Sequence, residues 1–518
     1  MSMFKKAIAA VCCICTAFSV GACGKSNFKE ESVDLENDML SGSLNIRLWD
    51  GGFGEEWLDN IIVAFNEKYP DVEVDVSSSP ERQQVFGDII GLGSKYDIIF
   101  SESLLSDYAE ECLEPLDEVW AYTNSGESMS VGEKIMPIYA KYLNLRGHYY
   151  QIPSYVGSYG IAYNNDYIRD DEIPVTTDEL KALCETLKSE TLTPIIFSGE
   201  AGVNYWDYLY YTWYAQYEGK EVYSAALSGQ SIDENGEYYF DPQTAYLDGG
   251  LKAMQVCEDL LWYENGYIDL DSAALSFMIA QRSFLKGEAA MMYNGSWLFN
   301  EMQLMFPDGP EYDIKMMKAP VISAIREKCN KIESDEELSA LVRAIDAGET
   351  ALSGEGYSVS QEDFDKVSEA RNFFYAGSEG ATGVVPINAR NKQIAKRFLS
   401  FMYSEKGIEQ HALAKAGNIL PVKNFNVEIE TEDVFTETAY NILLNNEVFF
   451  NNPVIAIPAR CTKDLYTGSI ELQFGSQKKS DRTRAQDSFN AKKDAFTKDN
   501  NDKFWTELLN KGYITSKP

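Results

Sequence analysis

The first candidates for binding chemistry are aromatic and acidic residues that directly follow two of three predicted strands. Trp49 and Asp50 follow the first strand, and Ser101 and Glu102 follow the third. An aromatic ring matches the apolar C–H face of a pyranose, whereas carboxylates and hydroxyls match its polar edge. Charged groups form the stronger hydrogen bonds to hydroxyls. In an acidic chain with 32 tyrosines and 8 tryptophans, these residues suit neutral polyols better than anionic ligands.

These residues are positioned by a predicted alternation of strands and helices. Residues 44–48 alternate between apolar and polar side chains, as in a strand, and apolar residues between 57 and 65 recur at helical spacing. Further elements are predicted over residues 72–76 (strand), 80–90 (helix) and 96–100 (strand). This order indicates an α/β fold with a parallel, doubly wound sheet. In such sheets ligands bind outside the carboxyl ends of the strands.

Composition argues against several other kinds of site. The chain has 45 basic and 81 acidic residues, and its formal charge of −36 repels polyphosphate, so nucleic-acid binding is not expected. His148 and His411 are its only histidines. Histidine-rich metal sites and Ser/His/Asp or Cys/His nucleophile systems need at least one placed histidine. We therefore expect no catalytic residues, no metal site and no cofactor.

The N-terminus carries the three regions of an export signal in order. Two lysines precede an apolar stretch over residues 7–20, which is shorter than an ordinary membrane-spanning helix. The run VGAC that ends at Cys23 resembles the lipobox of bacterial lipoproteins, in which the cysteine is acylated after cleavage. This predicts a signal peptide over 1–22 and a lipid-anchored, flexible tether over 23–43. An ordinary secretory signal or a short core helix is the alternative.

Four stretches of the sequence resemble the family 1 extracellular solute-binding proteins, the sugar-binding subunits of ABC importers. They are AFNEKYPDVEV (64–74), YYQIP with the later AYNND (149–166), FLKGEAAMMYNGSW (284–297) and the run from AKRFLSF to Pro421 (395–421). The stretches occur in the family's order and cover roughly residues 44 to 425. The resemblance implies a two-lobed periplasmic-binding-protein (type II) fold, each lobe a sheet flanked by helices, with a hinge between them. Ligand is then captured in the cleft between the lobes.

The resemblance also assigns candidate ligand contacts. Trp297, with Ser296 beside it in an Asn-Gly-Ser turn, stands where the family presents a stacking tryptophan; core packing is the alternative. Glu102 stands where the family often places an acid that contacts hydroxyls, and a helix N-terminal acid is the alternative. Tyr155 and Ser158 lie in the segment that crosses to the second lobe, where hinge packing and ligand contact are equally consistent.

Two further candidates rest on the residues themselves. Asp50 ends the first strand, and a turn or cap role is its alternative. Trp206 could provide a second stacking platform. It also begins a helical stripe with Leu209, Tyr210 and Trp213, which is typical of a helix that packs into a core.

The predicted lobes are discontinuous in sequence. Lobe 1 is assigned residues 44–150 and about 312–385, and lobe 2 is assigned residues 151–311 and about 386–518. Residues 320–375 are charged and helix-prone, and we interpret them largely as a polar insertion on a surface.

The best-supported function is an extracellular lipoprotein that captures a carbohydrate, an oligosaccharide by preference, and delivers it to ABC transporter permease subunits. We expect a monomer, anchored to the cell membrane by lipid and facing outside the cytoplasm. The same fold binding a peptide or a polyamine is one alternative. An exported glycoside hydrolase is another, which needs two carboxylates roughly 5 to 10 Å apart. With 81 acidic residues, such pairs arise by chance.

Overall fold

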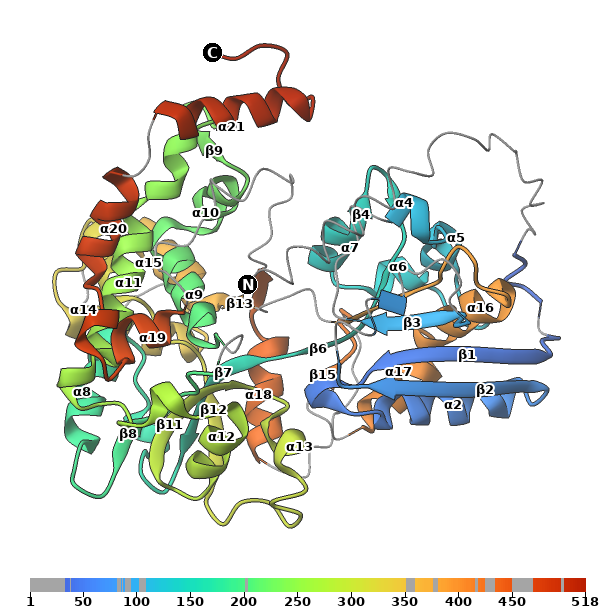
Figure 1. Ribbon diagram of the computed structural model, residues 1–518, viewed down its shortest axis with the longest axis horizontal. Helices are drawn as coiled ribbons and strands as arrows, with labels where there is room; N and C mark the ends of the chain where they lie inside the picture. Colours follow the sequence, from blue (N-terminus) through green and yellow to red (C-terminus); the bar gives the residue numbers. More distant parts are fainter. Residues whose placement is uncertain are drawn as a thin grey trace.

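The structure is a computed structural model in which two lobes lie side by side (Figure 1). It describes residues 33–37, 39–81, 85, 87–88, 95–101, 109–200, 204–350, 359–375, 381–414, 418–423, 434–449, 469–494 and 498–518. The predicted signal peptide, Cys23 and Glu102 lie outside the described residues, and so does most of the predicted helix over 80–90.

The first lobe is built on a six-stranded sheet with the order β15-β6-β14-β3-β1-β2. Its strands are β1 (Gly42–Trp49), β2 (Val72–Ser79), β3 (Ile98–Ser101), β6 (Ile152–Gly157), β14 (Ala381–Val384) and β15 (Asn418–Ile419). Strand β1 runs parallel to β2 and β3, which confirms the parallel arrangement predicted for this region. Strand β14 runs antiparallel to both β3 and β6, so the complete sheet is mixed.

Alternation along β1 determines which side chains enter the core of this lobe. Leu44, Ile46 and Leu48 are fully buried and share a hydrophobic cluster with Trp57 of α2 (Glu56–Lys68). The other helices of this lobe are α4 (Ala109–Cys112), α5 (Asp117–Ala121), α6 (Val131–Lys134), α7 (Pro137–Leu143), α16 (Lys392–Met402) and α17 (Glu405–Ala412). A short hairpin joins β4 (Asn144–Leu145) to β5 (His148–Tyr149). The burial of one face of β1 fixes the strand register, because a slip of one residue would expose these side chains.

The second lobe is built on a four-stranded sheet with the order β12-β7-β11-β8. Its strands are β7 (Tyr159–Asn164), β8 (Thr193–Ile195), β11 (Ala289–Gly295) and β12 (Ile314–Met317). Strand β7 pairs antiparallel with β11 and β12, whereas β11 runs parallel to β8. Every residue of β7 and β11 is buried, as expected for central strands covered on both faces.

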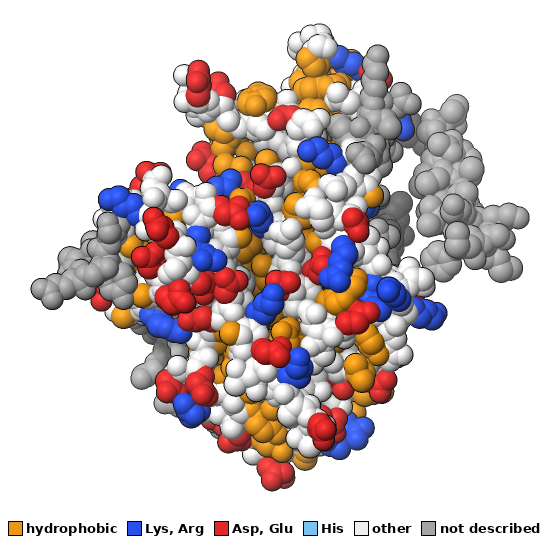
Figure 2. Space-filling model, turned by 90° about the vertical axis from the view of Figure 1, so that its left-hand side faces the viewer, with side chains coloured by type: hydrophobic (Ala, Val, Ile, Leu, Met, Phe, Trp, Pro, Cys, Tyr) orange, Lys and Arg blue, Asp and Glu red, His pale blue; other side chains and the backbone are white. Residues whose placement is uncertain are grey.

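Many helices surround this second sheet. They are α8 (Thr177–Leu187), α9 (Trp206–Glu218), α10 (Lys220–Leu227), α11 (Asp248–Leu261), α12 (Phe277–Leu285), α13 (Leu298–Met302), α14 (Asp335–Asp346), α15 (Gln361–Asn372), α18 (Val434–Leu444), α19 (Ile470–Gly475), α20 (Ala485–Asp494) and α21 (Lys498–Asn510). Two small strand pairs join β9 (Gln230–Ile232) to β10 (Tyr238–Phe240) and β13 (Phe373–Tyr375) to β16 (Glu447–Phe449). On the face of this lobe that Figure 2 shows, acidic and basic side chains are interspersed. In the described part of the chain, no helix is long and apolar enough to cross a membrane.

After residue 311, the strand pairing assigns the chain to the two lobes differently from the boundaries expected from the sequence. Strand β12 pairs with β7, Val321 forms a bridge with Thr176, and α14 and α15 bury apolar side chains, so residues 314–350 and 359–375 belong with the second sheet. Strands β14 and β15 pair with β6, which places residues 381–414 and 418–423 with the first sheet. The charged residues of α14 and α15 suggested a surface insertion, but α14 buries apolar residues such as Leu341, and α15 buries Phe364 and Val367 together with the charged Asp363 and Arg371.

A buried carboxyl group lies in the core of the second lobe. Glu471 of α19 is 1% exposed, and its Oε1 accepts a hydrogen bond of 2.9 Å from the backbone N–H of Trp206. Its Oε2 is buried without a hydrogen-bond partner among the described residues. Burial raises the pKa of Glu471 to about 7, against the hydrogen bond from Trp206, which lowers it. The acid therefore stays protonated at pH values where it would ionise in the unfolded chain.

This burial predicts a pH-dependent stability. Since the folded-state pKa lies above the ordinary 4.5, the unfolded chain loses its proton first, so the contribution is fully present below pH 4.5 and is lost as pH rises to about 7. Compared with Glu471→Gln, the wild-type protein should lose on the order of 3 kcal/mol of unfolding free energy between pH 4.5 and 7.5. Urea unfolding at both pH values measures this difference. Glu288→Gln, at an exposed acid, is the control, and a pH-independent difference for Glu471→Gln would contradict the assignment.

Candidate functional site

The two lobes meet where a short helix of one contacts a short helix of the other. The 3-10 helix η1 (Gly51–Phe53) follows β1, and α13 follows the turn after β11. Asn300 of α13 donates a hydrogen bond from Nδ2 to the backbone carbonyl of Gly52, at 2.7 Å. Gly52 allows this close approach, because a Cβ there would lie 2.7 Å from Cδ1 of Trp297 and 2.8 Å from Oε1 of Glu301.

Aromatic rings gather behind this contact, and we call them the interlobe aromatic cluster. Its members are Phe53, Tyr155, Tyr159, Tyr205, Tyr208 and Trp297. Trp297 makes edge-to-face contacts with Phe53 of the first lobe, at 5.2 Å between ring centroids, and with Tyr159 of the second lobe, at 4.9 Å. The ring of Tyr155 lies 4.9 Å from that of Phe53. The cluster thus draws on both lobes and on the crossing segment.

The structure brings Trp297, Tyr155, Ser158 and Ser296, four of the predicted ligand contacts, into one region. The two serines tie the crossing segment to the turn before Trp297. The backbone N–H of Ser296 donates to the carbonyl of Ser158 at 2.9 Å, and the backbone N–H of Ser158 donates to Oγ of Ser296 at 3.1 Å. Both serines are buried. These two hydrogen bonds fix the backbone immediately before Trp297.

The two residues at the end of β1 lie beside η1 but behave differently. Trp49 donates from Nε1 to the carbonyl of Pro80 at 3.1 Å, and its ring covers the backbone of Gly51. Asp50 does not cap the helix that it precedes, and its Oδ1 is buried without a hydrogen-bond partner among the described residues. Burial raises the pKa of Asp50, and the nearby Glu55 adds to the rise. An unsatisfied buried acceptor is costly, so this carboxyl gains from a donor that a ligand supplies.

Trp206 does not join the cluster. It is 3% exposed, its ring lies 6.4 Å from that of Trp213, and its backbone N–H is held by Glu471. This position agrees with the core-stripe interpretation of the helix rather than with a second stacking platform.

Several residues at the site were not identified from the sequence. Phe53, Tyr159 and Tyr205 contribute rings, and Glu301 contributes a carboxyl group beside Gly52. Burial raises the pKa of Glu301 to about 7, whereas the hydrogen bond of 2.7 Å from Nε2 of Gln281 acts in the opposite direction. The four-residue spacing between Trp297 and Glu301 was the available signal, because on a helical turn it places both side chains on one face.

No metal chemistry is suggested by the residues that the structure covers, since no group of three or more His, Cys, Asp or Glu there could hold a metal ion. The site instead combines flat aromatic surfaces with carboxyl groups on both lobes. Such an arrangement binds neutral ligands that have apolar faces and hydroxyl edges.

The tight fit at Gly52 predicts a variant that separates the lobes. In Gly52→Ala the new methyl group would overlap Trp297 and Glu301, both on the opposite lobe, only when the lobes are closed. We expect a larger radius of gyration in small-angle scattering and weaker ligand binding, with the fold of each lobe intact. Gly87→Ala is the matched control, because Gly87 is exposed and a Cβ there meets no heavy atom of the described residues within 4 Å. Equal radii for Gly52→Ala and wild type would show that this contact does not hold the lobes together.

Comparison with solved structures places the chain in a known fold. The GacH receptor of Streptomyces glaucescens, solved unliganded and with acarbose, is 17% identical, with a TM-score of 0.56, and the match covers 88% of this chain and 98% of that one. The Thermus thermophilus maltotriose-binding protein, bound with maltotriose, is 16% identical with a TM-score of 0.52, over 88% and 100% of the two chains. These matches confirm the predicted two-lobed type II fold.

Sequence comparisons identify the family. The maltotriose-binding protein of Pyrococcus abyssi is 24% identical over 230 residues, which is 44% of this chain and 44% of that protein, so the match spans less than half of the relative's length. The family model for bacterial extracellular solute-binding proteins matches residues 52–409. That range includes Gly52 and Phe53 of η1, the crossing segment and Trp297. Because it covers more than half of the chain, this protein belongs to the bacterial extracellular solute-binding protein family.

Proposed function

We propose that this protein captures an oligosaccharide between its lobes, outside the cytoplasm, and delivers it to the permease of an ABC importer. The observation that carries this proposal is the interlobe aromatic cluster, to which both lobes contribute rings. Members of the family are binding proteins. Relatives named for maltotriose and a receptor solved with acarbose support a carbohydrate as the ligand.

In this proposal, different side chains contact the apolar face and the hydroxyl groups of the sugar. The ring of Trp297 offers a surface for the C–H face of a pyranose once the lobes separate and Phe53 withdraws from its edge. Asp50 on the first lobe, whose Oδ1 has no partner among the described residues, and Glu301 on the second accept hydrogen bonds from the hydroxyls of the sugar. A ligand that contacts both lobes at once stabilises the closed arrangement, because only that arrangement provides all of its contacts.

Capture by stacking predicts a specific loss in Trp297→Ala. In a thermal-shift screen of mono- and oligosaccharides, a bound sugar should raise the melting temperature of the wild-type protein by mass action. The variant should show little or no rise, because removal of a central aromatic contact weakens binding at least about tenfold. The ligand-induced rise is compared rather than the melting temperature itself, since the variant also loses packing.

Tyr239→Ala serves as the control for this screen. Tyr239 is an aromatic residue that is half exposed in the β9–β10 hairpin. This variant should keep the full sugar response. A screen in which no sugar acts, but a peptide or a polyamine does, would replace carbohydrate with that ligand. A sugar response that survives in Trp297→Ala would remove the stacking role.

Delivery to a permease requires that the protein stays near the membrane, and we assign this to lipid on Cys23. The support is the lipobox-like run before this residue and the polar tether that follows. Two or three acyl chains anchor a protein firmly, whereas a single chain binds only weakly. The binding unit is proposed to act as a monomer that contacts the permease with both lobes.

The anchor predicts a change of location for Cys23→Ser. In a bacterial host with lipoprotein processing, the wild-type protein should incorporate labelled palmitate and sediment with membranes, whereas Cys23→Ser should do neither. Cys112→Ser, at a free cysteine inside the first lobe, is the control and should behave as wild type. Palmitate labelling that persists in Cys23→Ser would refute the assignment.

A further inference from the structure

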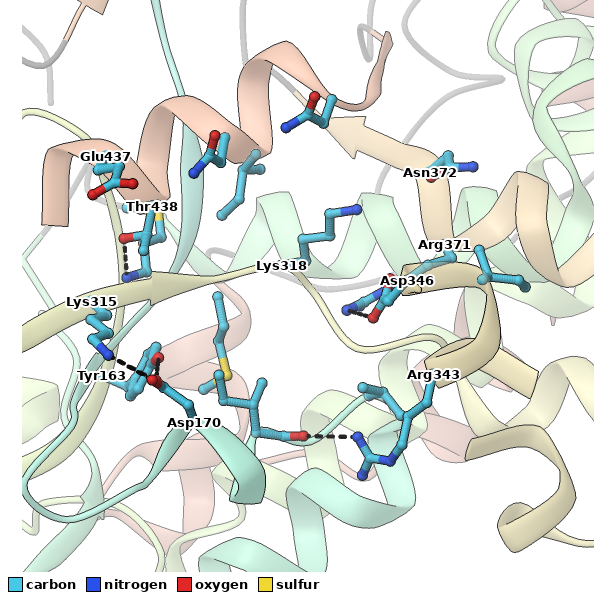
Figure 3. Close-up of a pocket in the computed structure, with 18 of the residues that line it drawn as sticks. Tyr163, Asp170, Lys315, Lys318, Arg343, Asp346, Arg371, Asn372, Glu437 and Thr438 are labelled. Atoms are coloured by element: carbon cyan, nitrogen blue, oxygen red, sulfur yellow. Dashed lines mark hydrogen bonds and ion pairs between the residues drawn. The ribbon is translucent and has the colours of Figure 1, made fainter. Parts of the chain in front are cut away.

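A groove on the second lobe lies apart from the interlobe site and shares no lining residue with it. It runs beside β12, with α18 on one side and the C-terminal ends of α14 and α15 on the other (Figure 3). Its volume is about 800 Å³, and small-molecule sites span roughly 300 to 1,000 Å³. We call it the Lys318 groove, and its polar lining includes Lys315, Lys318, Arg371, Asn372, Asn441 and Asn445.

Most of the charged groups in this groove already have partners. Lys315 contacts both carboxylate oxygens of Asp170 at 2.9 Å. Arg371 holds Asp346 through two hydrogen bonds, of 2.9 and 2.8 Å. Arg343, a fourth cation of the lining, is paired with the carboxylate of Glu179 at 2.9 Å. These cations are therefore neutralised by the protein itself.

Lys318 differs from the other three cations. It follows β12 directly, and its ammonium group points across the groove between α18 and the Arg371–Asp346 pair (Figure 3). Within the described part of the chain it forms no hydrogen bond or ion pair, although it is half-buried. Burial and the charge of Arg371 together lower the pKa of Lys318 to about 8, although the nearby charge of Asp346 acts in the opposite direction. At neutral pH the groove thus holds a partly desolvated ammonium group that forms no ion pair with a described acid.

Three carboxamide groups line the same groove as this ammonium group. Asn441 and Asn445 lie four residues apart on α18 and its C-terminal end, so both face the groove, and Asn372 ends α15 on the opposite wall. Each carries N–H donors, of which one in Asn372 already contacts Oγ of Ser368 at 3.5 Å. Glu437 lies toward the Lys315 end of the groove in Figure 3, away from Asn372. The Lys318 end therefore gathers donors, and an anion provides the acceptors that match them.

We propose that the Lys318 groove is a second binding site, which takes a small molecule carrying a carboxylate or phosphate group. The anionic group contacts the ammonium of Lys318 and the amides of Asn372 and Asn441, and the rest of the molecule occupies the groove along α18. Charge-assisted hydrogen bonds of this kind are about twice as strong as neutral ones. The site is separate from the proposed carbohydrate site between the lobes, because no lining residue is common to both.

The test is calorimetric titration of the protein at pH 7 and low salt with glucuronate, glucose 6-phosphate and inorganic phosphate. Glucose is the neutral counterpart. At least one of these anions should bind saturably and more tightly than glucose. Binding of glucuronate would indicate a carboxylate ligand, and binding of glucose 6-phosphate or inorganic phosphate would indicate a phosphate ligand. Lys318→Met should weaken that binding at least about tenfold, since it removes the charged donor. Lys318→Arg should retain most of it.

Lys331→Met is the matched control, because Lys331 is an exposed lysine of the same segment, and this variant should bind as wild type. If Lys318→Met does not fold, NMR of ¹³C-labelled lysine in the wild-type protein gives an independent measurement. The Lys318 resonance, assigned by its loss in Lys318→Arg, should report a higher pKa when the anion is bound. Absence of saturable binding by every probe, unchanged affinity in Lys318→Met, or displacement of the anion by a sugar would overturn the proposal.

Discussion

The segment that runs from β6 through Ser158 into β7 belongs to both sheets, and every other feature of the site depends on it. Its residues are buried throughout, and glycines at two positions permit contacts that a side chain would prevent. A Cβ on Gly157 would lie 2.5 Å from the ring of Phe53, and one on Gly160 would lie 2.7 Å from Met316. Since the segment is packed on both sides, the lobes can move mainly by rotation about it. Such a hinge brings η1 and α13 together or apart and leaves each sheet intact.

Rotation about this segment brings residues of both lobes together at the site between them. The first lobe contributes a short helix with a close backbone approach at Gly52 and the carboxyl group of Asp50, whose Oδ1 accepts no hydrogen bond from a described residue. The second contributes Trp297, which the serine pair at the crossing holds in place. Neither lobe alone surrounds a ligand, so affinity and closure are linked by the same contacts. The Lys318 groove is different in kind, because all of its walls belong to the second lobe and rotation does not assemble it.

The sequence predicted the parallel strands β1, β2 and β3 because apolar residues alternate in β1 and β2, a clear helix separates these two strands, and β3 is a short apolar run. It also placed Trp297 at a turn beside the site. It missed Phe53 and Tyr159, since a single ring in a loop or a fully buried strand has no period that marks its partner. The lobe boundaries after residue 311 differed for a similar reason: α14 is capped by Ser334 and carries a charged face, and only its contacts in the folded chain reveal which sheet its buried face covers. Long-range pairing, such as that of β14 between β3 and β6, leaves no local signal.

The position of β14 in the first sheet determines when that sheet can form during folding. Strands β3 and β6 are separated in the sheet by β14, whose first residue, Ala381, lies more than two hundred residues after the end of β6. Until β14 pairs with them, β3 and β6 each leave one strand edge unpaired. Such edges are prone to pair with other chains. Contacts of this sequence separation also form slowly, because a long loop must close first. An emerging chain therefore cannot complete the first sheet until the elements from β7 to α15, which make up most of the second lobe, have followed β6.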